Sequence, residues 1–530
     1  MAGDRVENYI EGLYADARRA RLINRTNLSG ILSANAGTYV GRKYAFAAIS
    51  SAADYARALP VTDYSFYAQY VARMAEGEQN ILTAERPACF LYTSGTMGVR
   101  KVLPLTQTAL SRYGAYIHLM PFCLTGARGG SSLHTSVFTP EDGKGGLLLS
   151  SAYFGYLQSH GLIEGEYLGG KPLNFASGIQ NVPYVKLRLA LACENLLSIQ
   201  SIFMYDALLT FGYLEENWQT ILRDMRDGRS PSELPASSAQ LLNSLGTVGA
   251  ERIKQLESIF EGGFSRPVAP KIWPNLRFVS GIGGGARSWQ TEALRKYTGN
   301  IPLYFFTYTS SEVMGGVALE LEKAQYMLLP RSAYYEFIPS GGNIPVAMEE
   351  LSVGCEYEPV VTTFSGLYRY RTGDIIKITG LCGQSPLFEV SGRISDMLNV
   401  AGEKIDEATI SHAVRLLQAD GVEVYDFVVC EQPCAAPGRY VFFMEGSADR
   451  SLPGRLDGIL RRLSPDYCEL RDLGMIDMPE VCHLNRFKID AALHNGVTAH
   501  KKAHAIGSAA SFYKLTEQYA ADNGGKNFEE

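Results

Sequence analysis

The first 80 residues place apolar positions at helical spacing between short turns, so this segment predicts a series of helices. Thr62 or Asp63 is the expected N-cap of a helix that runs to residue 76 and ends at Gly77. An apolar run at Ala88–Tyr92 then predicts the first buried strand, and a helix is expected to resume at Thr106 or Gln107. The intervening turn is therefore expected to lie between a strand and a helix.

A long apolar stretch, Val182–Arg229, predicts a helical region that is buried or lines an apolar cavity. Ordinary core packing is the simpler interpretation for each of its residues taken singly. Further on, Leu276–Ser280 predicts a strand before a glycine run and a helix from Trp289, and Ile301–Tyr308 predicts another strand.

The next part of the chain reads as a β-rich subdomain, with strands expected at Tyr334–Ile338, Val360–Tyr370, Ile375–Thr379 and Phe388–Val390. Beyond it the pattern becomes α+β, with helices at Asp406–Gln418 and Gly454–Leu463 and strands at Val422–Val429 and Tyr440–Phe443. We therefore expect a large N-terminal domain over residues 1–392 and a smaller one over 393–530.

Composition fits a globular protein too long for a single core, with 530 residues, 46% of them hydrophobic and 20% charged. A net charge of -6 argues against a generic nucleic-acid binder. No signal peptide and no convincing membrane span is evident. Nine scattered cysteines, an odd number, suit the reducing cytoplasm, and the pair Cys430 and Cys434 lacks the partners of a zinc site.

The turn after the first strand has the composition of a phosphate-binding loop. It contains Thr93, Ser94, Gly95, Thr96 and Gly98, and Lys101 follows. Glycines let backbone N–H groups approach a ligand, and hydroxyls and lysine offer donors and charge to phosphate oxygens. The Walker A pattern is absent, and a plain surface turn is the alternative.

A second glycine run, Gly281–Gly285, follows a predicted strand and matches GxGxxA, so a Rossmann dinucleotide site is one interpretation. No repeated βαβ pattern accompanies this run. We therefore favour a role in which Gly283 and Gly284 let the backbone pass close to a flat nucleobase.

Two further motifs carry carboxylates. Thr309, Ser310 and Ser311 precede Glu312 at the end of a predicted strand, where a carboxylate can hold a metal ion on phosphates; a helix N-cap is the alternative. Asp374, after Gly373, offers two acceptor oxygens to a ribose diol; the alternative is a hairpin turn in which Arg371 pairs with Asp374.

Four motifs thus stand in a fixed order: YTSGTMGVRK, TYTSSE, YRYRTGD and GRISDMLNVAGEKI. These four motifs make the chain resemble the acyl-adenylate-forming superfamily. Within this superfamily it more closely resembles the plant-type acyl acid amido synthetases, the Gretchen Hagen auxin-responsive family. ILSANAGTYVGRKYAF, YYEFIP and VVTTFSGLYRYRTGDIIKITG carry the closer resemblance. It implies an α/β acyl-adenylate-forming fold with a small, mobile α+β C-terminal domain.

The resemblance also implies site residues. The loop at 93–98 and Lys101 would hold the ATP phosphates, Tyr308 to Ser311 would lie beside adenine and the α-phosphate, and Glu312 would be associated with Mg²⁺. Asp374 would bind the ribose and Arg393 the nucleotide near a hinge at Ser395 or Asp396. The C-terminal adenylation lysine has no clean match; Lys501 and Lys502 are the best candidates, followed by Lys488.

The implied reaction is ATP-dependent ligation of a carboxylic acid to an amine, an amino acid in this family, through an acyl-adenylate with release of AMP and pyrophosphate. The apolar helices of residues 185–215, with Phe203 and Tyr205, would line the acid pocket. An acyl-CoA ligase and a non-catalytic nucleotide-binding relative are alternatives. Neither nucleic acid nor a membrane is an expected partner.

Overall fold

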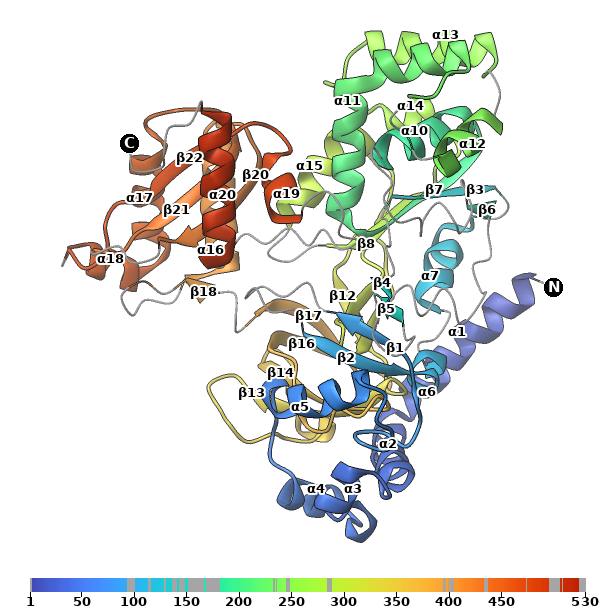
Figure 1. Ribbon diagram of the computed structural model, residues 1–530, viewed down its shortest axis with the longest axis vertical. Helices are drawn as coiled ribbons and strands as arrows, with labels where there is room; N and C mark the ends of the chain where they lie inside the picture. The colour runs from blue at the N-terminus through green and yellow to red at the C-terminus, as the bar shows by residue number, and fades with distance from the viewer. Residues whose placement is uncertain are drawn as a thin grey trace. The chain divides into compact units, whose positions relative to one another are not determined.

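The computed structural model describes residues 2–92, 101–112, 116–127, 130–135, 141–142, 148–150, 166–167, 182–231, 234, 236–244, 248–283, 288–393, 397–398, 400, 405–432, 437–472, 474–494, 506–507 and 509–523. The chain divides into two compact units, one of residues 1–93, 101–283 and 294–390 and another that holds residues 391–530 (Figure 1). None of the helices in these residues combines the length and apolar character needed to cross a bilayer.

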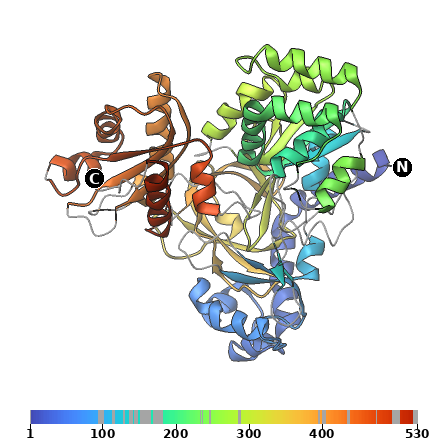
Figure 2. The same ribbon diagram turned by 45° about the horizontal axis from the view of Figure 1, so that its top comes forward.

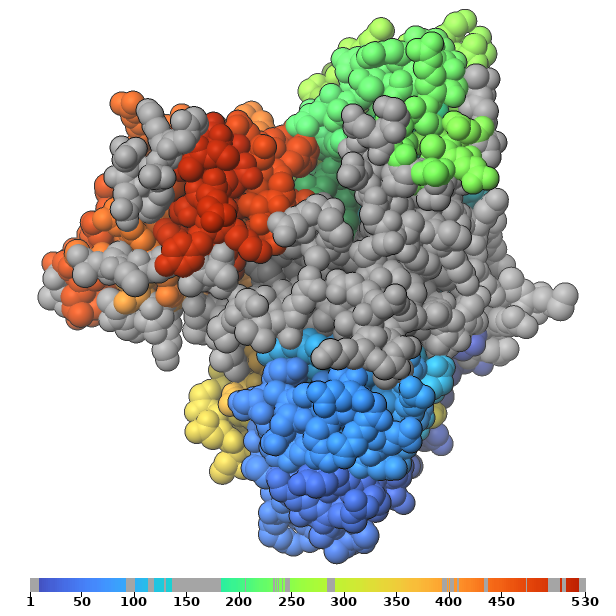
Figure 3. Space-filling view, in the orientation of Figure 1, coloured from blue at the N-terminus to red at the C-terminus, as the bar shows by residue number. Residues whose placement is uncertain are grey.

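The chain begins with helices, as predicted, and in Figure 3 the segment before β1 (Pro87–Tyr92) accounts for most of one continuous surface, coloured blue. Asp63 caps α5 (Tyr64–Ala75) by accepting from Ser65 N. After β1 the structure differs from the prediction, because a second strand, β2 (Val102–Thr106), pairs antiparallel with β1 before α6 (Gln107–Arg112). The glycine-rich turn therefore connects two strands of a hairpin.

A five-stranded parallel sheet has the spatial order β6-β3-β7-β8-β9. Its strands are β6 (Glu166–Tyr167), β3 (Ser131–His134), β7 (Leu196–Phe203), β8 (Phe278–Ile282) and β9 (Leu303–Tyr304). The prediction of continuous helix over Val182–Arg229 is wrong, because β7 lies between α10 (Val182–Ala192) and α11 (Met204–Asp227). Seven of the eight residues of β7 are buried, which explains why its sequence resembles that of the helices around it.

An eight-stranded sheet has the order β10-β11-β12-β17-β16-β14-β13, with β15 paired to β14, and confirms the β-rich subdomain. The single strand expected at Ile301–Tyr308 is instead two strands in different sheets, β9 and β10 (Thr307–Thr309). The other members are β11 (Met314–Ala318), β12 (Gln325–Leu328), β13 (Ala333–Pro339), β14 (Glu356–Thr363), β15 (Tyr370–Arg371), β16 (Asp374–Cys382) and β17 (Ser385–Arg393).

The second unit contains a sheet of the order β20-β21-β22, formed by Val424–Glu431, Tyr440–Gly446 and Glu480–Leu484. Helix α20 (Ala509–Asp522) lies against β20 and β22, as Figures 1 and 2 show. The core between this helix and the sheet includes Cys430 of β20, Phe443 of β21 and Phe512 of α20 itself. Helices α16 (Glu407–Ala419) and α17 (Leu452–Leu463) lie close to the predicted bounds.

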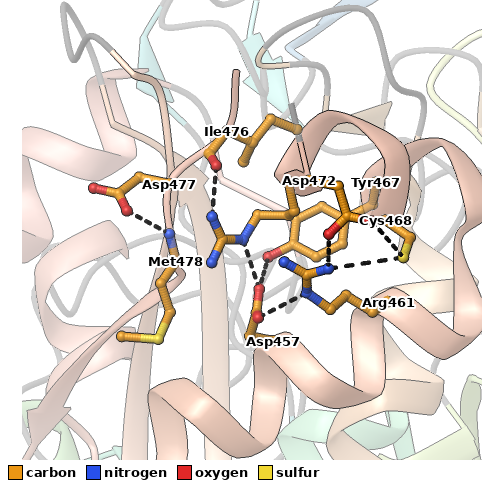
Figure 4. Close-up of polar contacts among 9 residues, drawn as sticks. Asp457, Arg461, Tyr467, Cys468, Asp472, Ile476, Asp477 and Met478 are labelled. Carbon is orange, nitrogen blue, oxygen red and sulfur yellow. Dashed lines mark hydrogen bonds and ion pairs between the residues drawn. The ribbon is translucent and has the colours of Figure 1, made fainter. Parts of the chain in front are cut away.

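Asp457 of α17 joins this helix to α18 (Pro465–Asp472) (Figure 4). Its carboxylate accepts from Arg461 Nε at 3.0 Å, Arg471 Nε at 2.7 Å and the Tyr467 hydroxyl at 2.8 Å. Burial acts to raise the pKa of Asp457, but these three donors together hold it below its usual value. Arg471 also donates to the Ile476 carbonyl at 2.8 Å, which ties the segment before β22 to the same cluster.

Candidate functional site

Two motifs of the sequence are joined by a reciprocal pair of tyrosines. Tyr308, in TYTSSE, donates its hydroxyl to Asp374 Oδ2 at 2.8 Å. Tyr370, in YRYRTGD, donates its hydroxyl to Glu312 Oε1 at 3.1 Å. In each motif the tyrosine stands four residues before the carboxylate, so each supplies the donor for the carboxylate of the other. We call these four residues the tyrosine brace.

Glu312 lies in the turn between β10 and β11. Ser310 Oγ accepts from the backbone N–H groups of Glu312 and Val313, both at 3.3 Å, and Ser310 N donates to the Val313 carbonyl at 2.9 Å. The chain continues into β11, so the alternative in which Glu312 belongs to a helix N-cap is wrong. The side chain is buried, at 7% exposure.

No lysine or arginine of the described residues forms an ion pair with Glu312, and its Oε2 accepts no hydrogen bond from them. A buried carboxylate without a counter-charge is costly, so this side chain suits a cation supplied from outside the protein. Among the described residues, those around Glu312 included, no three His, Cys, Asp or Glu side chains come together as a metal site.

Asp374 begins β16 directly after Gly373, whose φ of +75° is one that residues with a side chain rarely adopt. Buried Glu358 holds this turn by accepting from Gly373 N at 3.0 Å and from Arg371 Nε at 2.9 Å. Arg371 therefore pairs with Glu358, and the alternative in which Arg371 pairs with Asp374 is wrong. Asp374 is half-buried, so its carboxylate remains within reach of a ligand.

The segment before this turn is fixed by residues from the start of the chain. Thr62 N donates to the Arg369 carbonyl at 2.8 Å, and Arg371 N donates to the Thr62 carbonyl at 2.9 Å, one on each side of Tyr370. The Arg369 guanidinium is buried against Glu336, with Nε 3.0 Å from Oε2 and Nη2 2.9 Å from Oε1. Burial raises the pKa of Glu336 even though both arginine contacts act to lower it.

Lys101 stands at the start of β2, with its Nζ 5.7 Å from the centre of the Tyr64 ring. The Tyr64 hydroxyl accepts from Val102 N at 2.9 Å and lies 3.1 Å from the Val102 carbonyl, so α5 fixes the chain directly after Lys101. Hydrogen bonds from Ser65, with a smaller contribution from Lys101, lower the pKa of Asp63.

Gly281, within β8, and Gly283, just after it, allow close packing. A Cβ at Gly281 would lie 2.8 Å from Met204 N, and one at Gly283 would lie 2.8 Å from Met204 Cγ. The described neighbours of Gly283 are thus Met204 of α11 and the Phe305 ring, and its proximity to a nucleobase stays a prediction. Phe203, the last residue of β7 and the N-cap of α11, is half-buried.

Several predicted site residues lie outside the described residues: Thr93, Ser94, Gly95, Thr96, Gly98, Gly284, Ser395, Asp396, Lys501 and Lys502. The side chains of Tyr205 and Arg393 also lie outside the description. Lys488, the second choice for the adenylation lysine, is the first residue of α19 (Lys488–His494), where its Nζ is 3.7 Å from Asp522 Oδ1.

Tyr370 is the site residue that the sequence reasoning missed. The sequence does hold a signal that singles out this tyrosine, because both motifs place a tyrosine four positions before the carboxylate. Nothing in the sequence, however, pairs the tyrosine of one motif with the carboxylate of the other.

The comparisons agree on one family. Residues 9–303 match the family model described as "GH3 family N-terminal domain", and residues 326–393 match "GH3 family central domain". Indole-3-acetic acid-amido synthetase GH3.2 of Arabidopsis thaliana is 27% identical over 458 residues, which are 79% of this chain and 83% of that protein. Jasmonoyl--L-amino acid synthetase GH3.5 of Oryza sativa subsp. japonica is 27% identical over 485 residues, with 84% and 83% covered.

Among solved structures, the GH3.15 acyl acid amido synthetase matches with a TM-score of 0.85 at 23% identity, covering 96% of this chain and 95% of that one. A 2-hydroxyisobutyryl-CoA ligase matches with a TM-score of 0.54 at 13% identity, covering 95% and 93%. These matches confirm the acyl-adenylate-forming fold. The glycine run also follows the fourth strand of a parallel sheet of the order 2-1-3-4-5, whereas a Rossmann fingerprint follows the first, so the interpretation of this run as a Rossmann dinucleotide site is wrong. Because the N-terminal family model alone spans more than half of the sequence, the chain belongs to the GH3 family.

Proposed function

We propose that this protein is an ATP-dependent ligase that adenylates a carboxylic acid and transfers the acyl group to an amino acid, with release of AMP and pyrophosphate. The names of its relatives support this reaction, since they include an indole-3-acetic acid-amido synthetase, a 4-substituted benzoates-glutamate ligase and a jasmonoyl--L-amino acid synthetase. The observation that carries the proposal is the tyrosine brace, which orients one carboxylate suited to a cation and one suited to a ribose.

In this reaction the protein positions the reactants and balances their charge. Asp374 would accept hydrogen bonds from the ribose hydroxyls, while the Tyr308 hydroxyl fixes its other oxygen. Glu312 would hold a divalent cation through the oxygen that Tyr370 leaves free, and a carboxylate oxygen is the donor that Mg²⁺ prefers. When bound, Mg²⁺ would neutralise charge on the phosphate oxygens, and Lys101 would add to this effect.

The acid is proposed to bind near Phe203. In a parallel sheet ligands bind outside the carboxyl ends of the strands, at the point where the strand order reverses. Here that point lies between β3 and β7, and Phe203 ends β7. An apolar lining at this place would favour a hydrophobic or aromatic acid.

We further propose that residues 393–530 move as a unit about the segment near Gly392, with Lys501 or Lys502 serving adenylation. A cytoplasmic location suits the eight cysteines of the described residues, all of which carry free thiols.

The test is AMP release from ATP over a panel of carboxylic acids, each with and without a mixture of the amino acids, and separately with CoA. Release that needs both an acid and an amino acid supports the amide ligase and identifies both substrates. Release that needs CoA would instead make the protein a thioester ligase, and no release from any acid would contradict the proposed activity.

The brace carboxylates give a sharper prediction. Glu312→Gln and Asp374→Ala should each lower acid-dependent pyrophosphate release by about 10-fold or more, because each removes a contact to the nucleotide or its cation. Asp374→Ala should also lose the preference for ATP over 2′-deoxyATP, while Glu312→Gln should keep it. Glu349→Gln is the matched control and should retain full activity, because half-buried Glu349 pairs with the exposed side chain of Arg25 and contacts neither carboxylate of the brace.

A further inference from the structure

Tyr370 is held more rigidly than the carboxylate that it contacts. Tyr370 is 2% exposed. Its backbone pairs with Val361 of β14 and also forms a β-bridge with Thr62. The Tyr67 ring lies 5.8 Å from the Tyr370 ring, centre to centre. Contacts with Val361, Thr62 and the Tyr67 ring therefore fix the position of the Tyr370 hydroxyl.

Glu312 has no comparable support. Its backbone N–H is bonded to Ser310 Oγ within the same turn, and its carboxylate receives a single hydrogen bond from the described residues, that of Tyr370. A glutamate side chain has three rotatable bonds, and ordering it without a partner costs free energy. The Tyr370 hydroxyl is thus the group that selects the orientation of Glu312.

We propose that Tyr370 is a positioning residue for divalent cation binding: its hydroxyl holds Glu312 Oε1 so that Oε2 faces the metal–nucleotide complex. This inference rests on the proposed function. It extends that function to a residue that would act on the cation through Glu312. Partners of this kind typically change metal affinity or activity by about 10- to 100-fold.

Tyr368 provides a matched control. It lies two residues earlier in the same segment, is fully buried, and donates its hydroxyl to the Leu82 carbonyl at 2.5 Å. Tyr370→Phe and Tyr368→Phe therefore each remove one buried hydroxyl, but only the first frees the carboxylate of Glu312.

The experiment is calorimetric titration of the full chain with ATP, in the absence and presence of MgCl2 and without any acid substrate. The gain in ATP affinity caused by MgCl2 should fall by about 10-fold in Tyr370→Phe and stay at the wild-type value in Tyr368→Phe. In a Glu312→Gln background, Tyr370→Phe should cause no further loss, because the two residues act as one unit.

An unchanged Mg²⁺-dependent gain in Tyr370→Phe, or an equal loss in Tyr368→Phe, overturns the proposal. Thermal unfolding of each variant reports folding, and a structure of the wild-type chain with Mg²⁺ and ATP tests the contact without any substitution. A Tyr370 hydroxyl beyond hydrogen-bonding distance of Glu312 in that complex would contradict the inference. Acid-dependent AMP release by the wild type decides the proposed function separately.

Discussion

At the scale of single residues, the two halves of the tyrosine brace should have separable effects. Tyr308→Phe removes the donor to Asp374, so the carboxylate that we propose to bind the ribose loses its fixed orientation. We expect the KM for ATP to rise by about 10-fold and the preference for ATP over 2′-deoxyATP to fall, since a hydrogen bond to a charged group contributes about 1.5–3 kcal/mol. Steady-state kinetics with both nucleotides measures this effect.

Tyr304→Phe is the control for this prediction. Tyr304 is fully buried and donates its hydroxyl to the Ala318 carbonyl at 2.8 Å, with no contact to either carboxylate of the brace. It should leave the nucleotide preference unchanged even if it lowers stability. A loss of preference in Tyr304→Phe equal to that in Tyr308→Phe would show a general loosening of the fold.

The same scale shows what the sequence could predict about the site. Local motifs predict Glu312 and Asp374 as site residues, because hydroxyls and a glycine surround each carboxylate within a few positions. Their partners were not found, because hydrogen bonds such as Tyr370 to Glu312 join residues 58 positions apart and depend on how strands are arranged. For the same reason the alternative for this turn paired Arg371 with the nearby Asp374 and not with Glu358.

At the scale of elements, the edge of the eight-stranded sheet is closed by a helix. Asn24 of α2 (Ala20–Asn35) donates to the Tyr335 carbonyl at 3.0 Å and accepts from Tyr335 N at 2.8 Å. One amide side chain thus satisfies both backbone groups that an edge strand leaves open. Helix α2 therefore protects β13 from pairing with another chain.

Asn24→Ala should consequently destabilise the first unit. The substitution leaves two buried backbone groups of Tyr335 without partners, for an expected loss of about 2 kcal/mol or more. Thermal or urea-induced unfolding measures this loss, and light scattering reports association through the exposed edge. Thr26→Ala, an exposed position of the same helix, should change neither quantity; a similar loss there would contradict this explanation.

Element prediction failed where the sheet arrangement overrides the local pattern. Strand β2 contains Pro104, which has no N–H group to donate to a neighbouring strand and so disfavours a central position. In the structure β2 lies at the edge of its sheet. Strand β7 is an apolar run between two apolar helices, and periodicity cannot distinguish a fully buried strand from a buried helix. Glu194 and Asn195, which separate α10 from β7, were the signal for a break.

At the scale of the whole molecule, the second unit carries a buried acid that links its stability to pH. Glu445 is 2% exposed and accepts from the backbone N–H groups of Phe487 at 2.8 Å and Ile489 at 2.7 Å. Burial raises its pKa to about 7, above the value of 4.5 expected when the chain is unfolded. The folded unit therefore binds a proton between these values that the unfolded chain has released.

The free energy of unfolding of this unit should accordingly fall as the pH rises from about 4.5 to about 7, by an amount on the order of 3 kcal/mol from this group. Hydrogen exchange of β21 and β22, corrected for intrinsic rates, measures the change. Glu445→Gln should flatten the dependence, whereas Glu423→Gln, at an exposed position, should leave it intact. A steeper fall in Glu445→Gln would contradict this assignment.

The contact between Thr62 and Tyr368 has a consequence for biosynthesis. The Thr62 hydroxyl bonds to a carbonyl 306 positions later in the chain, and fully buried Tyr67 bonds to the same residue. At about 5 to 20 residues per second, the ribosome delivers that partner about 15 to 60 s after Thr62. During this interval the helices around Tyr67 lack the surface that buries them. Nascent chains of this protein should therefore engage chaperones until the YRYRTGD segment has emerged.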